Sequence, residues 1–172
     1  MAERPADVPT RRDDTRDPRA SRLAALRVLY AADVREVDPL DVLQEELEKQ
    51  RGDADDDLDT ATLDRFAVTL LHGLGGSMPE VDARIGRFAR GWRLERMPAV
   101  DRNVLRLAVH ELLTEPTPVA VVMNEAVRLA SELSTDDSGR YVNGVLSAIV
   151  KDLRRDAPAS GGEEAAADPD PA

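Results

Sequence analysis

The chain has 172 residues, 42% of them hydrophobic, which suffices for one domain whose core needs no metal or disulfide. It contains no cysteine, which excludes disulfide bonds and thiolate-bound metals. No apolar run approaches the roughly 18 residues of a membrane span, and the amino-terminal segment lacks the hydrophobic stretch of a signal peptide. We therefore expect a cytoplasmic protein that does not contact a membrane.

The net charge of −11 argues against nucleic-acid binding, because affinity for phosphate comes from lysine and arginine. The acidic residues, however, are segregated along the chain. Residues 52–59 hold five aspartates and residues 156–172 hold five acids, with no basic residue in either stretch. Without those ten, 24 acids remain against 23 basic residues. The rest of the chain is close to neutral and can carry a local basic patch.

Composition divides the chain into a central domain and two loose ends. Residues 1–17 are polar and charged, and residues 156–172 are rich in alanine, glycine and acids, so burial cannot offset the entropy of ordering them. We expect a disordered arm, a single domain over 18–155 and a disordered acidic tail. Within the domain, 52–59 is predicted to be an acidic linker, and Gly75-Gly76 is predicted to separate two helical blocks.

Local signals predict about seven helices and no sheet. No window alternates apolar and polar residues, whereas valine, isoleucine and leucine recur three and four residues apart. Ser77 with Glu80 has the spacing of a capping box, which marks a helix start. Three further pairs place a capping side chain before a proline at the first helical position: Asp17-Pro18, Asp38-Pro39 and Thr117-Pro118.

Three of the predicted helices have an apolar face at helical spacing, and we expect that of the last helix to pack inward. In the last helix this face consists of Val142, Val145, Leu146, Ile149, Val150 and Leu153. In the first helix it consists of Leu23, Leu26, Tyr30 and Val34. In the fifth helix it consists of Val100, Val104, Leu107, Ala108 and Leu112.

No constellation of residues predicts catalysis or a cofactor. His72 and His110 have no second histidine, cysteine or acidic cluster at ligand spacing. The glycine-rich stretch 73–80 lacks the lysine and hydroxyl of a phosphate-binding loop, so we interpret it as a helix junction. We expect a protein that is not an enzyme.

The acidic linker imitates part of a calcium-binding loop. Asp53, Asp55 and Asp57 have the spacing of the first three ligands, but Leu58 stands where the loop requires glycine and Asp64 where it requires glutamate. A solvated acidic linker is therefore the better interpretation, and we expect no metal site.

Arginine is the remaining residue type that could bind a ligand, because a guanidinium can form two hydrogen bonds to a phosphate or stack on a base. Its amino-terminal members are Arg11, Arg12, Arg16, Arg19, Arg22 and Arg27. Asp13, Asp14 and Asp17 interleave with them, so composition alone slightly favours a solvated tail over a phosphate-binding arm. A second series is interpreted as mostly a solvated helix face: Arg84, Arg87, Arg90, Arg93 and Arg96.

Three segments, in this order, resemble a known family. They are RGWRLERMPAVDRNVLRLAVHELL at 90–113, TPVAVVMNEAVRLA at 117–130 and RYVNGVL at 140–146. Each is weak alone, but their order and spacing are specific, and the chain resembles the NusB family over roughly residues 18–153. The segment STDDSGRYVNGVL is actinobacterial in style.

The resemblance implies an all-α fold of two orthogonally packed helical subdomains, about 18–76 and 77–155. It also implies a transcription antitermination factor that binds boxA-type single-stranded RNA together with NusE, a small ribosomal-subunit protein. Such a factor joins the RNA polymerase antitermination complex, notably for ribosomal RNA. It needs no cofactor.

The resemblance assigns binding residues as well. Those that would face RNA are Arg16, Arg19, Arg22, Asp137, Arg140 and Tyr141. Tyr141 offers an aromatic face to a base, and Asp137 either accepts hydrogen bonds from a base edge or caps a helix. The NusE face corresponds to Tyr30, Glu95 and Asp101, which suits a basic partner. Tyr30 is alternatively a core residue.

Two alternatives stay open. The first helix carries Pro18, Ala20, Ser21 and Leu23 where other family members often have basic residues. This depletion favours a second hypothesis, a helical protein-interaction or dimerisation module with little RNA binding of its own. The sequence also leaves monomer and homodimer open, and a dimer could cover the arginine arm.

Overall fold

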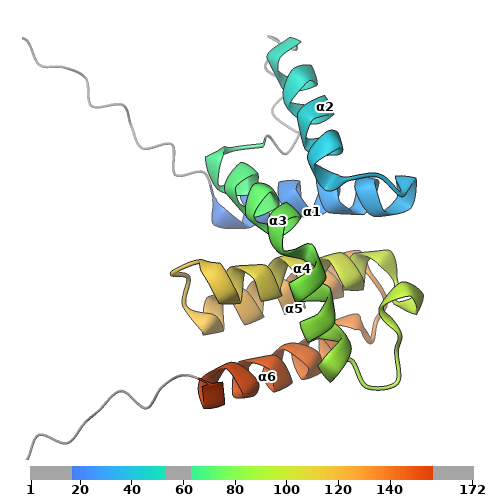
Figure 1. Cartoon of the computed structure of the whole chain (residues 1–172), viewed down its shortest axis with the longest axis vertical. Coiled ribbons are helices and arrows are strands. Elements are labelled where there is room, and N and C mark those ends of the chain that lie inside the picture. Colours follow the sequence, from blue (N-terminus) through green and yellow to red (C-terminus); the bar gives the residue numbers. More distant parts are fainter. Residues whose placement is uncertain (1–16, 53–62, 157–172) are drawn as a thin grey trace, which may run out of the picture.

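The computed structural model describes residues 17–52 and 63–156, and this part of the chain is entirely helical (Figure 1). The all-α prediction is confirmed, but the expected count of about seven is reached only if the short 3-10 helix is included. The arm, most of the acidic linker with Asp53, Asp55 and Asp57, and the tail lie outside the described residues. The elements are α1 (Pro18–Arg35), α2 (Pro39–Gly52), α3 (Arg65–Phe88), η1 (Leu94–Arg96), α4 (Ala99–Thr114), α5 (Val119–Leu133) and α6 (Ser138–Asp156).

Two of the three predicted proline starts are confirmed, and one is displaced by a residue. Asp17 caps α1 by accepting a hydrogen bond from Arg19 N at 3.0 Å, and Asp38 accepts one from Leu40 N at 2.8 Å. At the start of α5 no side chain caps the helix. There the carbonyl of Pro118 itself accepts the first helical bond, from Val121 N at 2.9 Å.

The predicted helix start at Ser77 is wrong, because α3 runs without interruption through residues 73–80. The Ser77 hydroxyl donates to the Gly73 carbonyl at 3.0 Å, within the helix, and Pro79 is an internal residue. Leu74 and Val81 on either side are fully buried, and this burial outweighs the local signals of glycine, serine and proline. The expected boundary between 76 and 77 therefore falls inside one helix.

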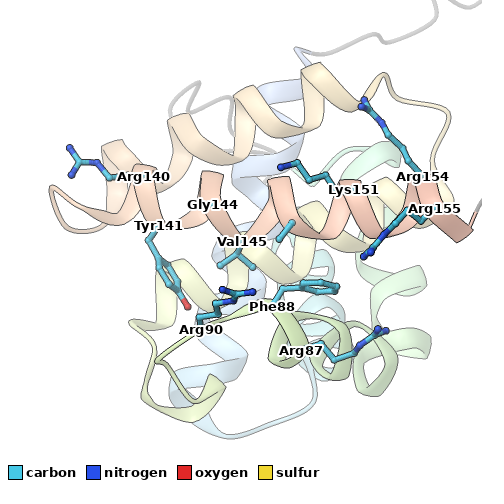
Figure 2. Close-up of a pocket in the computed structure, with 11 residues that line it drawn as sticks. Arg87, Phe88, Arg90, Arg140, Tyr141, Gly144, Val145, Lys151, Arg154 and Arg155 are labelled. Atoms are coloured by element: carbon cyan, nitrogen blue, oxygen red, sulfur yellow. The ribbon is translucent and has the colours of Figure 1, made fainter.

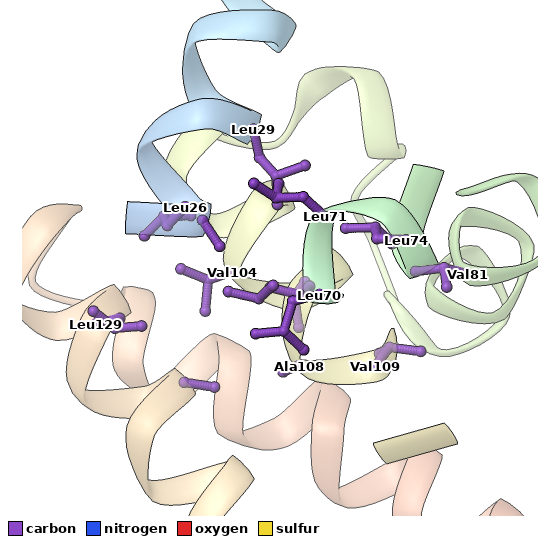
Figure 3. Close-up of a cluster of buried hydrophobic side chains, with 14 of the residues drawn as sticks. Leu26, Leu29, Leu70, Leu71, Leu74, Val81, Val104, Ala108, Val109 and Leu129 are labelled. Atoms are coloured by element: carbon purple, nitrogen blue, oxygen red, sulfur yellow. The ribbon is translucent and has the colours of Figure 1, made fainter. Parts of the chain in front are cut away.

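The core is one continuous cluster that draws on every α-helix and is centred on α4. Figure 3 shows leucines and valines of α1, α3, α4 and α5 meeting around Val104 and Ala108. α4 packs against α1, α3, α5 and α6, and nine of its sixteen residues are buried. The predicted apolar face of α6 is buried as well, from Val142 to Val150. No described helix has the length and apolarity needed to cross a membrane.

Partly buried polar contacts hold α4 against α1 and α3. Arg102 donates from Nη2 to Asp33 of α1 at 2.6 Å, and Asn103 donates to the same carboxylate at 3.0 Å. Arg106 pairs with Asp82 of α3 through two hydrogen bonds of 2.7 and 2.8 Å. These contacts fix the rotation of α4 about its own axis, which apolar packing alone specifies less strictly.

His110 lies in a tight space between α4 and α3. Its Nδ1 lies 3.1 Å from the Ser77 hydroxyl, and a Cβ added to Gly73 would lie 2.5 Å from its Nε2. A Cβ added to Gly76, one turn along the same helix, would meet nothing within 4 Å. Gly73 therefore leaves room for the His110 ring, whereas the position of Gly76 has space for a side chain.

We predict that Gly73→Ala lowers the free energy of unfolding by about 1–3 kcal/mol, because the new methyl group overpacks against the buried His110 ring. Gly76→Ala is the matched control and should raise it by about 0.5–1 kcal/mol, since alanine loses less backbone entropy in a helix. Urea denaturation of both variants measures the difference. Equal effects of the two substitutions would contradict this account of the helix contact.

Candidate functional site

Arg19 lies at the start of α1 and is held by carboxylates of α5. Its guanidinium forms ion pairs with Glu132 and, at 3.6 Å, with Glu125, and its side chain is 24% exposed. Arg128 also pairs with Glu132, at 3.0 Å, and this hydrogen bond lowers the pKa of Glu132 and keeps it ionised. A phosphate at Arg19 must therefore compete with two carboxylates. Arg16 lies outside the described residues.

Arg22 does not reach the surface, contrary to the role in RNA binding expected for it. Its guanidinium grips Glu111 of α4 through two hydrogen bonds, the Nε bond measuring 2.9 Å, and lies 5.5 Å from the centre of the Phe66 ring. Arg22 is 4% exposed and Glu111 is 1% exposed. The hydrogen bond to Glu111 raises the pKa of Arg22. This pair ties α1 to α4 inside the protein.

The start of α6 presents three of the predicted residues together. The carbonyl of Asp137 accepts the first helical bond, from Tyr141 N at 3.0 Å, while the Asp137 and Arg140 side chains are exposed. Figure 2 shows Arg140 pointing away from the helix and Tyr141 pointing toward the side where Arg90 lies. The Tyr141 hydroxyl is buried and has no hydrogen-bond partner within the described part of the chain. Burial, with the charge of Asp101, raises the pKa of Tyr141, so the phenol stays protonated.

Asp101 lies beside this cluster and is not an accessible partner-binding residue. It is 3% exposed, and its Oδ2 accepts a hydrogen bond from the Ser138 hydroxyl at 2.8 Å. Ser138 in turn accepts from Thr135 N at 3.1 Å. Asp101 thus fixes the turn before α6 and, through it, the positions of Arg140 and Tyr141.

Trp92 belongs to this surface, and sequence reasoning missed it. It is the only tryptophan in the chain, is 51% exposed, and its ring centre lies 6.4 Å from that of Tyr141 at an interplanar angle of 59°. Trp92 precedes η1 in sequence, and Tyr141 lies in the first turn of α6, so only the fold brings them together. The signal that could have indicated it is the position of the one tryptophan within the segment 90–113, next to arginines.

A second exposed surface is formed by α1 and η1. Tyr30 and Val34 of α1 are 43% and 61% exposed, so the core alternative for Tyr30 is wrong. Glu95 of η1 is exposed as well. Arg102 holds the two elements together, because it binds Asp33 of α1 and donates to the carbonyls of Leu94 and Met97, at 2.8 and 3.2 Å. Among the described residues, no three histidine, aspartate or glutamate side chains are grouped closely enough to hold a metal ion.

A model of the NusB family matches residues 19–151. The chain belongs to the NusB family. The transcription antitermination protein NusB of Acidothermus cellulolyticus is 45% identical over 130 residues, which cover 75% of this chain and 83% of that protein. The protein of the same name from Beutenbergia cavernae is 39% identical over 158 residues, covering 87% of this chain and 96% of that protein.

Solved NusB structures have the same fold. T. maritima NusB superposes with a TM-score of 0.66 at 33% sequence identity, covering 79% of this chain and 92% of that one. A chain in the crystal structure of antitermination factors NusB and NusE in complex with dsRNA superposes with a TM-score of 0.64 at 29% identity. That match covers 78% of this chain and 96% of the other.

We predict that Arg22→Met destabilises the protein by about 3–5 kcal/mol, because it leaves the Glu111 carboxylate buried without its partner. The double variant Arg22→Met, Glu111→Leu should recover most of this loss, since neither charge is then buried. Arg27→Met, on the exposed side of α1, is the control and should change stability by about 0.5 kcal/mol or less. Urea denaturation measures all three. A loss at Arg22 no larger than that at Arg27 would show that the buried pair is not structural.

Proposed function

We propose that this NusB-family chain is a transcription antitermination factor that binds boxA-type single-stranded RNA together with NusE. In this role it joins the RNA polymerase antitermination complex, notably during transcription of ribosomal RNA in the cytoplasm. It acts by recognition and performs no catalysis. The antitermination name of its relatives and the NusB–NusE complex with dsRNA support this function. Among the contacts of the chain itself, the proposal rests on the cluster at the start of α6, where Arg140 is exposed and Tyr141 is partly exposed.

The RNA site centres on Arg140, Tyr141 and Trp92. Two aromatic rings 6.4 Å apart give bases a surface to stack on, and the exposed Arg140 can bind the adjacent phosphate. The exposed carboxylate of Asp137 can accept a hydrogen bond from a base amino group. Arg19 contributes at the start of α1, weakened by its carboxylate neighbours, and Arg16 precedes it in the arm. Arg22 is left out because it is buried.

The NusE site uses Tyr30, Val34 and Glu95. An exposed tyrosine and valine provide the apolar centre of a contact, and Glu95 suits a basic partner. Asp101 is left out because its carboxylate is engaged beneath α6. Holding RNA and NusE on one scaffold raises the effective concentration of each for the other, so two weak interactions give stable assembly.

The two tyrosines of the chain allow a reciprocal test of this function. Tyr141→Ala should weaken binding of a labelled boxA RNA by about 1–3 kcal/mol, roughly 5- to 150-fold, because a stacking surface is lost. It should leave NusE binding unchanged. Tyr30→Ala should do the reverse, weakening NusE binding and leaving the affinity for RNA alone unchanged. Fluorescence anisotropy with and without NusE measures both.

Two outcomes would contradict the proposal. If no RNA bound in either condition while NusE still bound, the chain would be a protein-interaction module with little RNA binding of its own. If the two tyrosine variants affected RNA binding equally, the RNA surface would not be at the start of α6.

The single tryptophan reports directly on the RNA site. We predict that RNA binding changes the emission of Trp92, because a base that stacks near Tyr141 alters its exposed environment. NusE alone should leave this emission nearly unchanged, provided the NusE used contains no tryptophan. RNA binding detected by anisotropy without any change in emission would remove Trp92 from the RNA surface.

A further inference from the structure

A cationic groove continues along α6 beyond the cluster at its start, between that helix and the carboxyl end of α3 (Figure 2). Its volume is about 830 Å³. Six basic residues line it: Arg87, Arg90, Arg140, Lys151, Arg154 and Arg155. Arg87 and Arg90 belong to the arginine series that sequence spacing assigned to a solvated helix face. The fold instead places them opposite the cations of α6.

The groove is cationic because the carboxylate beneath it is turned inward. No acidic residue is among the described residues that line it. Asp152 lies beneath and is 6% exposed, within 3.8 Å of Arg87 and 3.2 Å of Arg155. The side chains of Arg87 and Arg155 remain 64% and 74% exposed, so both stay available to a ligand. A single buried carboxylate cannot neutralise six cations.

The side chains on the floor of the groove are small and apolar, so the backbone of a bound ligand can approach the helix closely. Gly144, Val145 and Ala148 form its middle, and nothing lies within 4 Å of where a Cβ on Gly144 would be. Arg140 lies at one end of this floor, Arg154 and Arg155 lie at the other, and Arg90 lies beside Val145 (Figure 2). From Arg140 to Arg154 the helix rises about 21 Å, which matches roughly six nucleotides at the spacing of a stacked strand. A compact anion would leave most of this length unused.

We propose that this α3–α6 groove binds the sugar-phosphate backbone of RNA that continues past the Arg140–Tyr141 site. The proposal rests on the proposed function, because the strand enters from the RNA site already described. The cations at the ends bind phosphates without reading sequence, and riboses lie over the apolar floor. The groove therefore lengthens the RNA contact by up to about six nucleotides and adds affinity that does not depend on base identity.

The test compares two RNAs, a short boxA-type RNA and the same RNA extended by six uridines, with the extension placed at either end in separate samples. Binding is measured in the presence of NusE at several salt concentrations. The variant Lys151→Gln, Arg154→Gln removes two groove cations that form no ion pair with a described residue, so the contacts of Asp152 are kept. The control Lys49→Gln, Arg51→Gln removes the same residue types from α2, at the opposite end of the molecule (Figure 1).

Wild type should bind one of the extended RNAs more tightly than the short RNA, with a steeper dependence on salt. The groove variant should lose that gain, and its log-log salt slope for the extended RNA should fall by about 1.4, or 0.7 for each lost phosphate contact. The control should behave as wild type, and the short RNA should bind all three proteins equally.

The outcomes separate this proposal from the function on which it rests. No gain from either extension in wild type, or an equal loss in the control variant, would overturn the groove proposal while leaving binding of the short RNA intact. A groove variant that lost affinity for a protein partner but not for extended RNA would overturn it in favour of an acidic protein ligand. Failure of the short RNA to bind wild type with NusE would instead refute the proposed function itself.

Discussion

The structure depends on one constraint: α4 is buried on several sides, and some of its polar residues are buried with it. The charges that α4 turns inward are held by opposite charges or, at Asp101, by a hydrogen bond from Ser138, because a buried charge without any polar partner costs several kcal/mol. Glu111 is paired with Arg22 of α1, and Arg106 is paired with Asp82 of α3. The pairs come from different helices and point in different directions. α1, α3 and α6 are therefore each fixed against α4 by a polar contact as well as by apolar packing.

The same constraint positions both exposed surfaces. Asp101 of α4 holds Ser138 and with it the start of α6, where Arg140 and Tyr141 are presented. Arg102, the next residue of α4, joins α1 to η1 and so fixes the surface that contains Tyr30. α4 contributes few exposed side chains of its own. Its role is to set the distance and orientation between two surfaces that the helices around it carry.

Sequence reasoning succeeded where the deciding interactions are local and failed where they are not. The apolar stripe of α6 and the capping carboxylate of Asp17 depend on residues within a few positions, and both were predicted. The role of Arg22 was predicted wrongly because its partner Glu111 lies 89 positions away in the sequence. Its neighbours in sequence belong to a polar, charged arm, which is typical of a surface segment. Ser77 was misjudged for a related reason, since the burial that keeps α3 helical comes from distant helices.

The net charge of the chain is likewise a poor guide to the charge of any one surface. Asp33, Asp82 and Glu111 are engaged by arginines at helix contacts, so these acids contribute little to the field outside the protein. The described residues that line the α3–α6 groove include six cations and no acid, and Asp152 beneath them is buried. At physiological salt the screening length is about 8 Å, so acids farther than this from a strand lying in the groove are largely screened from it. A net charge of −11 is therefore compatible with a local site for RNA, because a bound phosphate responds to the charges within that distance.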